Sequence, residues 1–307
     1  MPLAIDVRGL HKSYGPVEAV RGVDFSVERG RVFALLGPNG AGKTTITEIL
    51  EGYRERSSGE VSVLDHDPWR SGRDFKERVG IVLQSTGVDP YLTVTETLEL
   101  YRGYYPNPRP LDEVIEVVGL EGKREFRVNK LSGGQQRRLD VAVALAGDPE
   151  LLFLDEPTTG FDPNARRNAW EVVKNLASLG KTVFLTTHFM DEAQYLADEV
   201  AVIANGEIVA RGAPDTIGGR NTATAIVRFA MPAGLPEALS SVVQVDGGVA
   251  VLKSEDPREF LQALTRWALN TGEALEGLTV TRPTLEDVYL ELTGGTDAAS
   301  VEDEVST

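Results

Sequence analysis

Short apolar runs alternate with amphipathic segments along the first two thirds of the chain. Three runs are apolar at nearly every position, as in strands buried on both faces of a sheet: Arg31–Leu36, Leu151–Leu154 and Thr182–Thr186. Asn205-Gly206 between two such runs is a strong hairpin signal. The two strands that flank this turn are predicted at Val200–Ala204 and Glu207–Ala210, and further strands are predicted at Glu60–Leu64 and Gly80–Leu83.

Helices are predicted between these strands from their start signals. Thr93 and Glu96 have capping-box spacing, and Asp162-Pro163 places a cap before a proline at the first helical position. The predicted helices are Thr44–Glu51, a helix from Thr93 to about Arg102, Leu111–Val118, a helix capped by Ser132 that runs to about Ala146, and a helix from Asp162 to Leu179 with Gly180 beyond it. Strands that alternate with helices predict an α/β fold with a mostly parallel sheet. Residues 88–147 lack strand-like runs, which predicts an inserted helical subdomain.

The composition changes near residues 215–219, so we expect a main domain over 1–217 and a smaller one over 218–292. The smaller domain should be α+β, with strands at Ala223–Phe229 and Leu278–Thr281, two strands around Asp246-Gly-Gly248, a short helix, and helices at Pro257–Leu269 and Leu285–Leu292. It contains no catalytic constellation. Residues 293–307 are small, polar and acidic, which predicts a disordered tail.

Charge and composition narrow the function. The chain has 307 residues, 31 basic and 47 acidic, a net charge of −16, and no cysteine. The absence of cysteine excludes disulfides and cysteine-ligated metal sites. The acidic net charge argues against nucleic acid as a partner. The longest stretch without Asp, Glu, Lys or Arg is Val32–Gly42, 11 residues, against about 20 for a membrane span. No signal peptide is predicted.

The sequence Gly37-Pro-Asn-Gly-Ala-Gly-Lys-Thr-Thr45 matches the phosphate-binding loop G-x-x-x-x-G-K-[ST], between a predicted strand and a predicted helix. The loop curls so that backbone N–H groups point at phosphate oxygens, and the helix N-terminus adds positive partial charge. Lys43 is expected to reach the β- and γ-phosphates, and the Thr44 hydroxyl to reach Mg²⁺. The nucleotide-binding residues expected here are Gly37, Asn39, Gly40, Ala41, Gly42, Lys43, Thr44 and Thr45.

Two carboxylates end the strand at Leu151–Leu154. Asp155 is expected to hold the Mg²⁺ shell, as in other P-loop sites. Glu156 follows at once, and beside a triphosphate it can orient or deprotonate the attacking water.

Leu131-Ser-Gly-Gly-Gln135 is a second helix start that is suited to binding an anion. Here the chain resembles the ATP-binding cassette (ABC) family, whose signature motif is LSGGQ and whose motif order it shares over residues 3–217. The resemblance implies an ATPase that binds ATP and Mg²⁺. It also implies that Ser132, Gly133, Gly134 and Gln135 contact the nucleotide of a second subunit, in a homodimer.

The resemblance assigns further site residues. Tyr14 would stack on adenine, Gln84 would contact the metal and the nucleophilic water, and His188 would lie near the γ-phosphate. Asp162 stands in the D-loop, where Phe161 replaces the commoner leucine.

Three stretches, at 187–193, 196–198 and 282–289, resemble the ATPases of daunorubicin-resistance-type drug exporters, which pair with separate ABC-2 membrane proteins. This implies a cytoplasmic subunit, peripheral on the inner face of the membrane, that energises export of a drug-like or lipophilic substrate. Sibling systems for lipids or polysaccharides, an importer, and an ABC ATPase outside transport remain open. A P-loop kinase or GTPase is disfavoured by LSGGQ.

Overall fold

The computed structural model describes residues 2–82, 87–217, 225–232 and 234–281, together with Leu285, Asp287 and Tyr289. The chain divides into two compact units, Met1–Pro214 and Asp215–Thr307. The first unit contains every predicted ATP-site residue.

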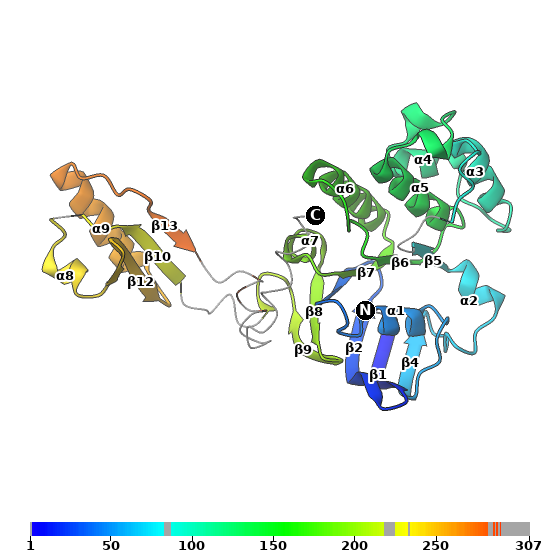
Figure 1. Ribbon diagram of the computed structural model, residues 1–307, viewed down its shortest axis with the longest axis horizontal. Helices are drawn as coiled ribbons and strands as arrows, with labels where there is room; N and C mark the ends of the chain where they lie inside the picture. The colour runs from blue at the N-terminus through cyan, green and yellow to red at the C-terminus, as the bar shows by residue number, and fades with distance from the viewer. Residues whose placement is uncertain are drawn as a thin grey trace. The chain divides into compact units, whose positions relative to one another are not determined.

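A six-stranded sheet forms the centre of the first unit (Figure 1). Its strands lie in the order β5-β6-β7-β3-β8-β9, all parallel except β9, which pairs antiparallel with β8. Every residue of β3 and β7 is buried, as their continuous apolar runs predict. The strands are β3 (Val32–Leu36), β5 (Val79–Val82), β6 (Leu151–Asp155), β7 (Thr182–Thr187), β8 (Glu199–Ala204) and β9 (Glu207–Gly212).

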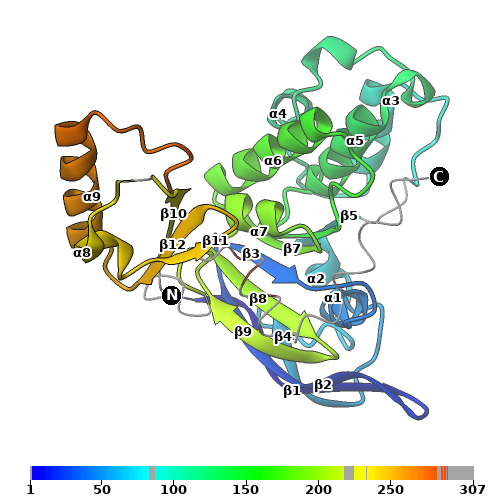
Figure 2. The ribbon, with the colours of Figure 1, turned by 60° about the vertical axis from the view of Figure 1, so that its left-hand side comes forward.

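A second, antiparallel sheet has the order β2-β1-β4 and is built from β1 (Leu3–Tyr14), β2 (Val17–Glu28) and β4 (Ser58–Val63). Helix α1 (Lys43–Leu50) contacts strands of both sheets, and its buried Ile46, Ile49 and Leu50 belong to an apolar core that includes residues of both. Helices α6 (Pro163–Ser178) and α7 (Met190–Leu196) cover the other face of the six-stranded sheet (Figure 2). The short helix α2 (Arg73–Glu77) packs on β5.

In the described part of the segment between β5 and β6, the named elements are all helices, as predicted. Its helices are α3 (Val94–Arg102), α4 (Leu111–Val117) and α5 (Gly133–Leu145), with 3₁₀ turns at Glu121–Lys123 and Val128–Lys130. Both predicted caps form: Thr93 and Glu96 bond reciprocally, and so do Ser132 and Gln135. Helix α5 packs on α3, α4 and α6 and on the edge strand β5.

Within its described residues, the second unit holds an antiparallel sheet of order β11-β12-β10-β13 and the helices α8 and α9. Its core gathers Val227, Phe229, Leu239, Ala250 and Leu264. The elements are β10 (Ala225–Ala230), α8 (Glu237–Ser240), β11 (Gln244–Asp246), β12 (Val249–Ser254), α9 (Arg258–Thr271) and β13 (Thr279–Thr281). The predicted α+β character is therefore present. Most of the predicted helix 285–292 and the whole tail 293–307 lie outside the described residues.

Candidate nucleotide site

The glycine-rich loop from Gly37 to Gly42 joins the buried strand β3 to helix α1. Gly40 and Gly42 have φ angles of 80° and 108°, a region that disfavours residues with a Cβ. The packing is equally restrictive, because a Cβ on Gly37 would lie 2.4 Å from the Ile203 carbonyl oxygen. The conformation of the loop is thus fixed by both backbone and neighbours.

The turn of the β8–β9 hairpin supports this loop from outside. Asn205 and Gly206 both have positive φ, as the hairpin signal predicts. The Gly206 N–H donates to the Ala41 carbonyl at 3.0 Å, and the Arg21 N–H donates to the Gly206 carbonyl at 2.8 Å. The hairpin therefore links the loop to β2.

Lys43 is the first residue of α1 and is 5% exposed. Its Nζ donates to the carbonyl oxygens of Gly37 at 2.8 Å and Pro38 at 3.1 Å, and lies 3.3 Å from Oε1 of Glu156. The ammonium group thus points back over the loop, toward the position where phosphates bind in sites of this type. Thr44, at the same helix end, is exposed.

Asp155 and Glu156 lie at the carboxyl end of β6, beside β7. Oδ1 of Asp155 accepts a hydrogen bond from Oγ1 of Thr186 at 2.5 Å. Glu156 has a φ of 44° although it is not a glycine, and its N–H donates to the carbonyl and the hydroxyl of Thr186.

A single hydroxyl oxygen from Thr44 and one carboxylate from Asp155 suit Mg²⁺, which keeps most of its shell for water and substrate phosphates. The residues present therefore fit this metal.

Three polar side chains surround the Glu156 carboxylate. Oε1 is 3.4 Å from Nδ1 of His188 and 3.3 Å from the Lys43 ammonium, and Oε2 accepts from the Thr159 hydroxyl at 3.0 Å. The His188 contact lowers the pKa of Glu156 most, burial opposes this, and Lys43 lowers the pKa further, to about 2. Glu156 is therefore ionised at neutral pH.

His188 is positioned by an aromatic and cationic stack. The centroid of its ring lies 4.1 Å from the centroid of the Phe189 ring. Arg166, which belongs to α6, places its guanidinium carbon 3.9 Å from the Phe189 centroid. Arg166 also pairs with Asp191 at 3.4 Å. Sequence reasoning found His188 but missed Phe189 and Arg166, because their contact joins α6 to the loop after β7 and has no local signal.

Tyr14 ends β1, is 40% exposed, and has cations near its ring. Lys12 Nζ lies 5.1 Å and the Arg54 guanidinium carbon 5.2 Å from the ring centroid. An exposed aromatic ring at this position is available for stacking. Gln84 lies outside the described residues.

The signature residues lie at the start of α5. Ser132 Oγ accepts from the Gln135 N–H at 3.3 Å, and Gln135 Oε1 accepts from the Ser132 N–H at 3.0 Å. Ser132 and Gly133 are exposed, and a Cβ on Gly134 would lie 3.5 Å from the Ala165 side chain, in ordinary contact. Asp162 caps α6 by accepting from two backbone N–H groups. The signature motif thus bonds within itself and presents an exposed helix end.

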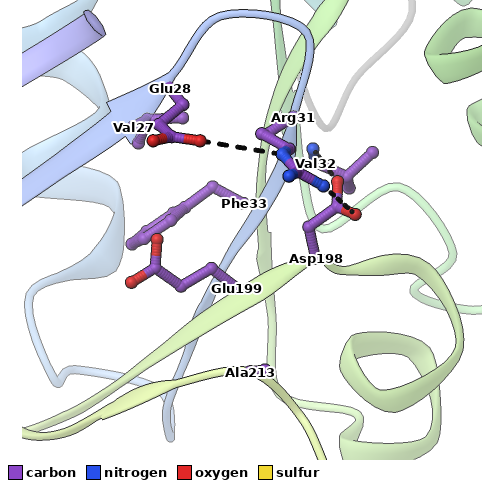
Figure 3. A pocket seen from close by; sticks show the side chains of 8 residues that line it. All are labelled: Val27, Glu28, Arg31, Val32, Phe33, Asp198, Glu199 and Ala213. Atoms are coloured by element: carbon purple, nitrogen blue, oxygen red, sulfur yellow. Dashed lines mark hydrogen bonds and ion pairs between the residues drawn. The ribbon is translucent and has the colours of Figure 1, made fainter. Parts of the chain in front are cut away.

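A pocket elsewhere in this unit lies at the opposite end of β3, where Val32 and Phe33 line it, and not after Leu36 (Figure 3). Asp198 there bonds the Val32 N–H at 2.9 Å and the Arg31 guanidinium at 3.2 Å. It is remote along β3 from the glycine-rich loop and contains none of the predicted ATP-site residues.

A strand, a glycine-rich loop, a buried lysine and paired carboxylates on a parallel sheet define a P-loop nucleotide hydrolase. Comparison with known proteins gives the family. The ABC transporter family model matches residues 20–159. Over 304 residues the chain is 38% identical to Nod factor export ATP-binding protein I of Rhizobium sp. (strain N33), covering 95% of this chain and 97% of that protein. Daunorubicin resistance ATP-binding protein DrrA3 of Streptomyces coeruleorubidus is 37% identical over 303 residues, with 95% and 96% covered.

Solved structures share the fold of the first unit. CbiO1 of Clostridium perfringens, part of an ABC transporter complex, matches with a TM-score of 0.62 and 27% identity over 70% of this chain and 90% of that one. A dimeric ATP-binding cassette in a post-hydrolysis state, bound to ADP and Pi, matches with a TM-score of 0.59 and 25% identity, covering 68% of this chain and 98% of that one. The chain belongs to the ATP-binding subunits of the ABC transporter family and is an ATPase. No helix within its described residues is long and apolar enough to cross a membrane.

Proposed function

We propose that this ATPase energises export of a drug-like or lipophilic substrate through a separate ABC-2-type membrane permease. The observation that carries the proposal is the similarity to the Nod factor export and daunorubicin resistance proteins, which extends over 95% of this chain and so includes the second unit. The subunit would lie at the cytoplasmic face of the membrane, bound to its permease.

Nucleotide binding is assigned to the loop Gly37–Thr45 and to Tyr14. Lys43 would turn from the carbonyls of Gly37 and Pro38 to the β- and γ-phosphates. Thr44 and Asp155 would hold Mg²⁺, which supplies charge stabilisation at the transferred phosphoryl group. Gln84 keeps its predicted role at the metal and water, although it lies outside the described residues.

Glu156 is assigned to orient the attacking water and accept its proton, with His188 beside it at the γ-phosphate. A carboxylate with a pKa of about 2 is a weak base. Movement of the Lys43 ammonium toward the phosphates would remove one of the charges that lower this pKa. The carboxylate would therefore become more basic when ATP binds.

The exposed start of α5 supports a homodimer with shared sites. Ser132 and the residues that follow it, Gly133, Gly134 and Gln135, would contact the γ-phosphate held by the second subunit, partly through backbone N–H groups. Asp162, at the start of α6, would lie at the same interface. The dimeric relative bound to ADP and Pi supports this arrangement.

The helical subdomain is the proposed contact with the permease. Its exposed aromatic residues include Tyr91, 70% exposed, and Tyr104, 65% exposed, on either side of α3 in sequence. Such surface aromatics are typical of protein interfaces. The second unit, which lacks ATP-site motifs, is proposed to stabilise the dimer or to contact the permease.

Glu156→Gln tests the catalytic assignment. The change keeps shape and removes charge, so ATP binding should persist while turnover falls by about 10²–10⁴-fold. An ATP-bound dimer should accumulate on size-exclusion chromatography. Glu99→Gln, at an exposed carboxylate on α3, is the matched control and should behave as wild type. Normal turnover in Glu156→Gln would rule out the assigned role.

Truncation near Gly218 tests the role of the second unit. Every ATP-site motif precedes Gly218, so ATP affinity measured by calorimetry should stay within about twofold of wild type. A twofold change is small, because about 1.4 kcal/mol of binding free energy corresponds to a tenfold change. Dimerisation without nucleotide, or export in cells with the permease, should weaken. A truncated protein that dimerises and exports normally would contradict the proposed role.

A further inference from the structure

The peptide bond between Asp155 and Glu156 is held from both sides. On one side, the Glu156 N–H donates to the carbonyl oxygen of Thr186 at 3.2 Å and to its hydroxyl at 3.1 Å. On the other side, the Asp155 carbonyl accepts from Nη2 of Arg137 at 2.9 Å. This one peptide unit joins the proposed metal-binding carboxylate to the proposed catalytic carboxylate.

The backbone at Glu156 needs such support. Its φ of 44° is in the left-handed region, which a residue with a long side chain adopts only when surrounding contacts hold it there. Rotation of this peptide unit would swing the carboxylate away from Lys43 and His188, which lie 3.3 Å and 3.4 Å from Oε1. The position of the carboxylate therefore depends on what holds the Asp155 carbonyl.

Arg137 comes from a different part of the fold than Thr186. It belongs to α5, five residues after Ser132, or about 7.5 Å along the helix axis. It is 8% exposed and also lies 4.0 Å from Asp140 on the same helix. Its neighbour Arg138 instead donates to carbonyls in the turn after α4, within the helical subdomain.

We propose that Arg137 is a positioning residue that ties the placement of α5 to the orientation of the Glu156 carboxylate. Helix α5 then carries the signature motif at its start. In its second turn it carries Arg137, which holds the Asp155–Glu156 peptide of the same subunit. Engagement of Ser132 by the nucleotide of a second subunit sets how firmly Glu156 is held in its own site. The inference rests on the proposed function, which assigns the water to Glu156 and the second nucleotide to Ser132.

Arg137→Met tests the inference, because methionine fills similar space and cannot donate. Turnover should fall by about 10- to 100-fold, as for a misplaced catalytic group, while ATP affinity from calorimetry stays within about twofold. Arg138→Met, the matched control, should keep wild-type turnover. Arg137→Lys retains charge but not the planar fork, and should show an intermediate loss; it replaces Arg137→Met if thermal unfolding shows that the methionine variant does not fold.

A double-mutant cycle separates positioning from simple helix anchoring. If Arg137 acts through Glu156, single-turnover hydrolysis by Arg137→Met/Glu156→Gln should be no slower than by Glu156→Gln alone. Multiplicative losses, or a parallel loss of ATP affinity and stability, would overturn the inference in favour of anchoring. Wild-type turnover in both Arg137 variants, with Glu156→Gln inactive, would also overturn it. Normal turnover in Glu156→Gln would instead remove the proposed function on which it rests.

Discussion

Two helix starts in the first unit are suited to anions, yet they are built differently. Helix α1 begins after Gly42, which makes no side-chain cap, and its first residue is the buried cation Lys43. Helix α5 begins after Ser132, which is exposed and bonds the backbone N–H of Gln135. The first is proposed as a phosphate site that one chain completes by itself. The second has already used one of its free N–H groups, and its exposure suits a surface that a second subunit completes.

Loss of the cation at α1 should have the largest effect. Lys43→Ala removes the charge at the phosphates and leaves Glu156 with one neighbour fewer, so turnover should fall by more than about 10²-fold. Steady-state phosphate release and ATP calorimetry measure this. Lys123→Ala is the control, because that ammonium lies 3.9 Å over the Phe126 ring in the helical subdomain. Turnover within twofold of wild type would show that α1 needs no cation.

Complementation between subunits tests the difference directly. Ser132→Arg should block the start of α5 without altering α1, whereas Lys43→Ala disables α1 and leaves α5 intact. Each of these two variants alone should therefore be inactive as a homodimer. An equal mixture should recover about a quarter of wild-type turnover, because about half of the dimers are mixed and each has one intact composite site. No recovery beyond the two parents, or full activity in a strict monomer, would mean that the two helix ends do not share nucleotides.

The free energy of unfolding at acid pH should reveal the charge cluster of Glu156, Lys43 and His188, which lies next to the start of α1 and not to that of α5. The pKa of Glu156 is lowered from 4.5 to about 2 in the folded protein, so its contribution is complete above pH 4.5 and is lost as pH falls toward 2. Between pH 6 and pH 3 the stability advantage of wild type over Glu156→Gln should shrink by about 2 kcal/mol. Urea unfolding at both pH values measures it. A constant difference would show that the carboxylate gains nothing from Lys43 and His188.

Much of this architecture follows from local sequence. The apolar runs place β3, β6 and β7, the capping residues place the starts of α3, α5 and α6, and Asn205-Gly206 places the β8–β9 turn. These features depend on neighbouring residues, so their patterns are visible in the chain. The motifs assigned Lys43 and Glu156 to one site, and the family resemblance added His188; Lys43 and His188 both lie beside the Glu156 carboxylate.

Other features depend on distant partners and left no local pattern. Strands β1 and β2 were not predicted, and register shifts interrupt their pairing at several points, which weakens the alternation that identifies a strand. Arg137 lies 18 residues from Asp155, whose carbonyl it bonds. Glu192 is fully buried and accepts from Thr158, 34 residues away. Only the folded chain reveals these pairs.

The hairpin turn that supports the glycine-rich loop has a thermodynamic consequence. Because Gly206 bonds the Ala41 carbonyl and Ile203 lies against Gly37, the loop is ordered by the rest of the unit before any phosphate arrives. The conformational entropy of the loop is therefore lost when the chain folds and does not have to be lost again when nucleotide binds. Substitutions in the hairpin turn, with no contact to ATP, should consequently weaken nucleotide affinity through the entropy of binding.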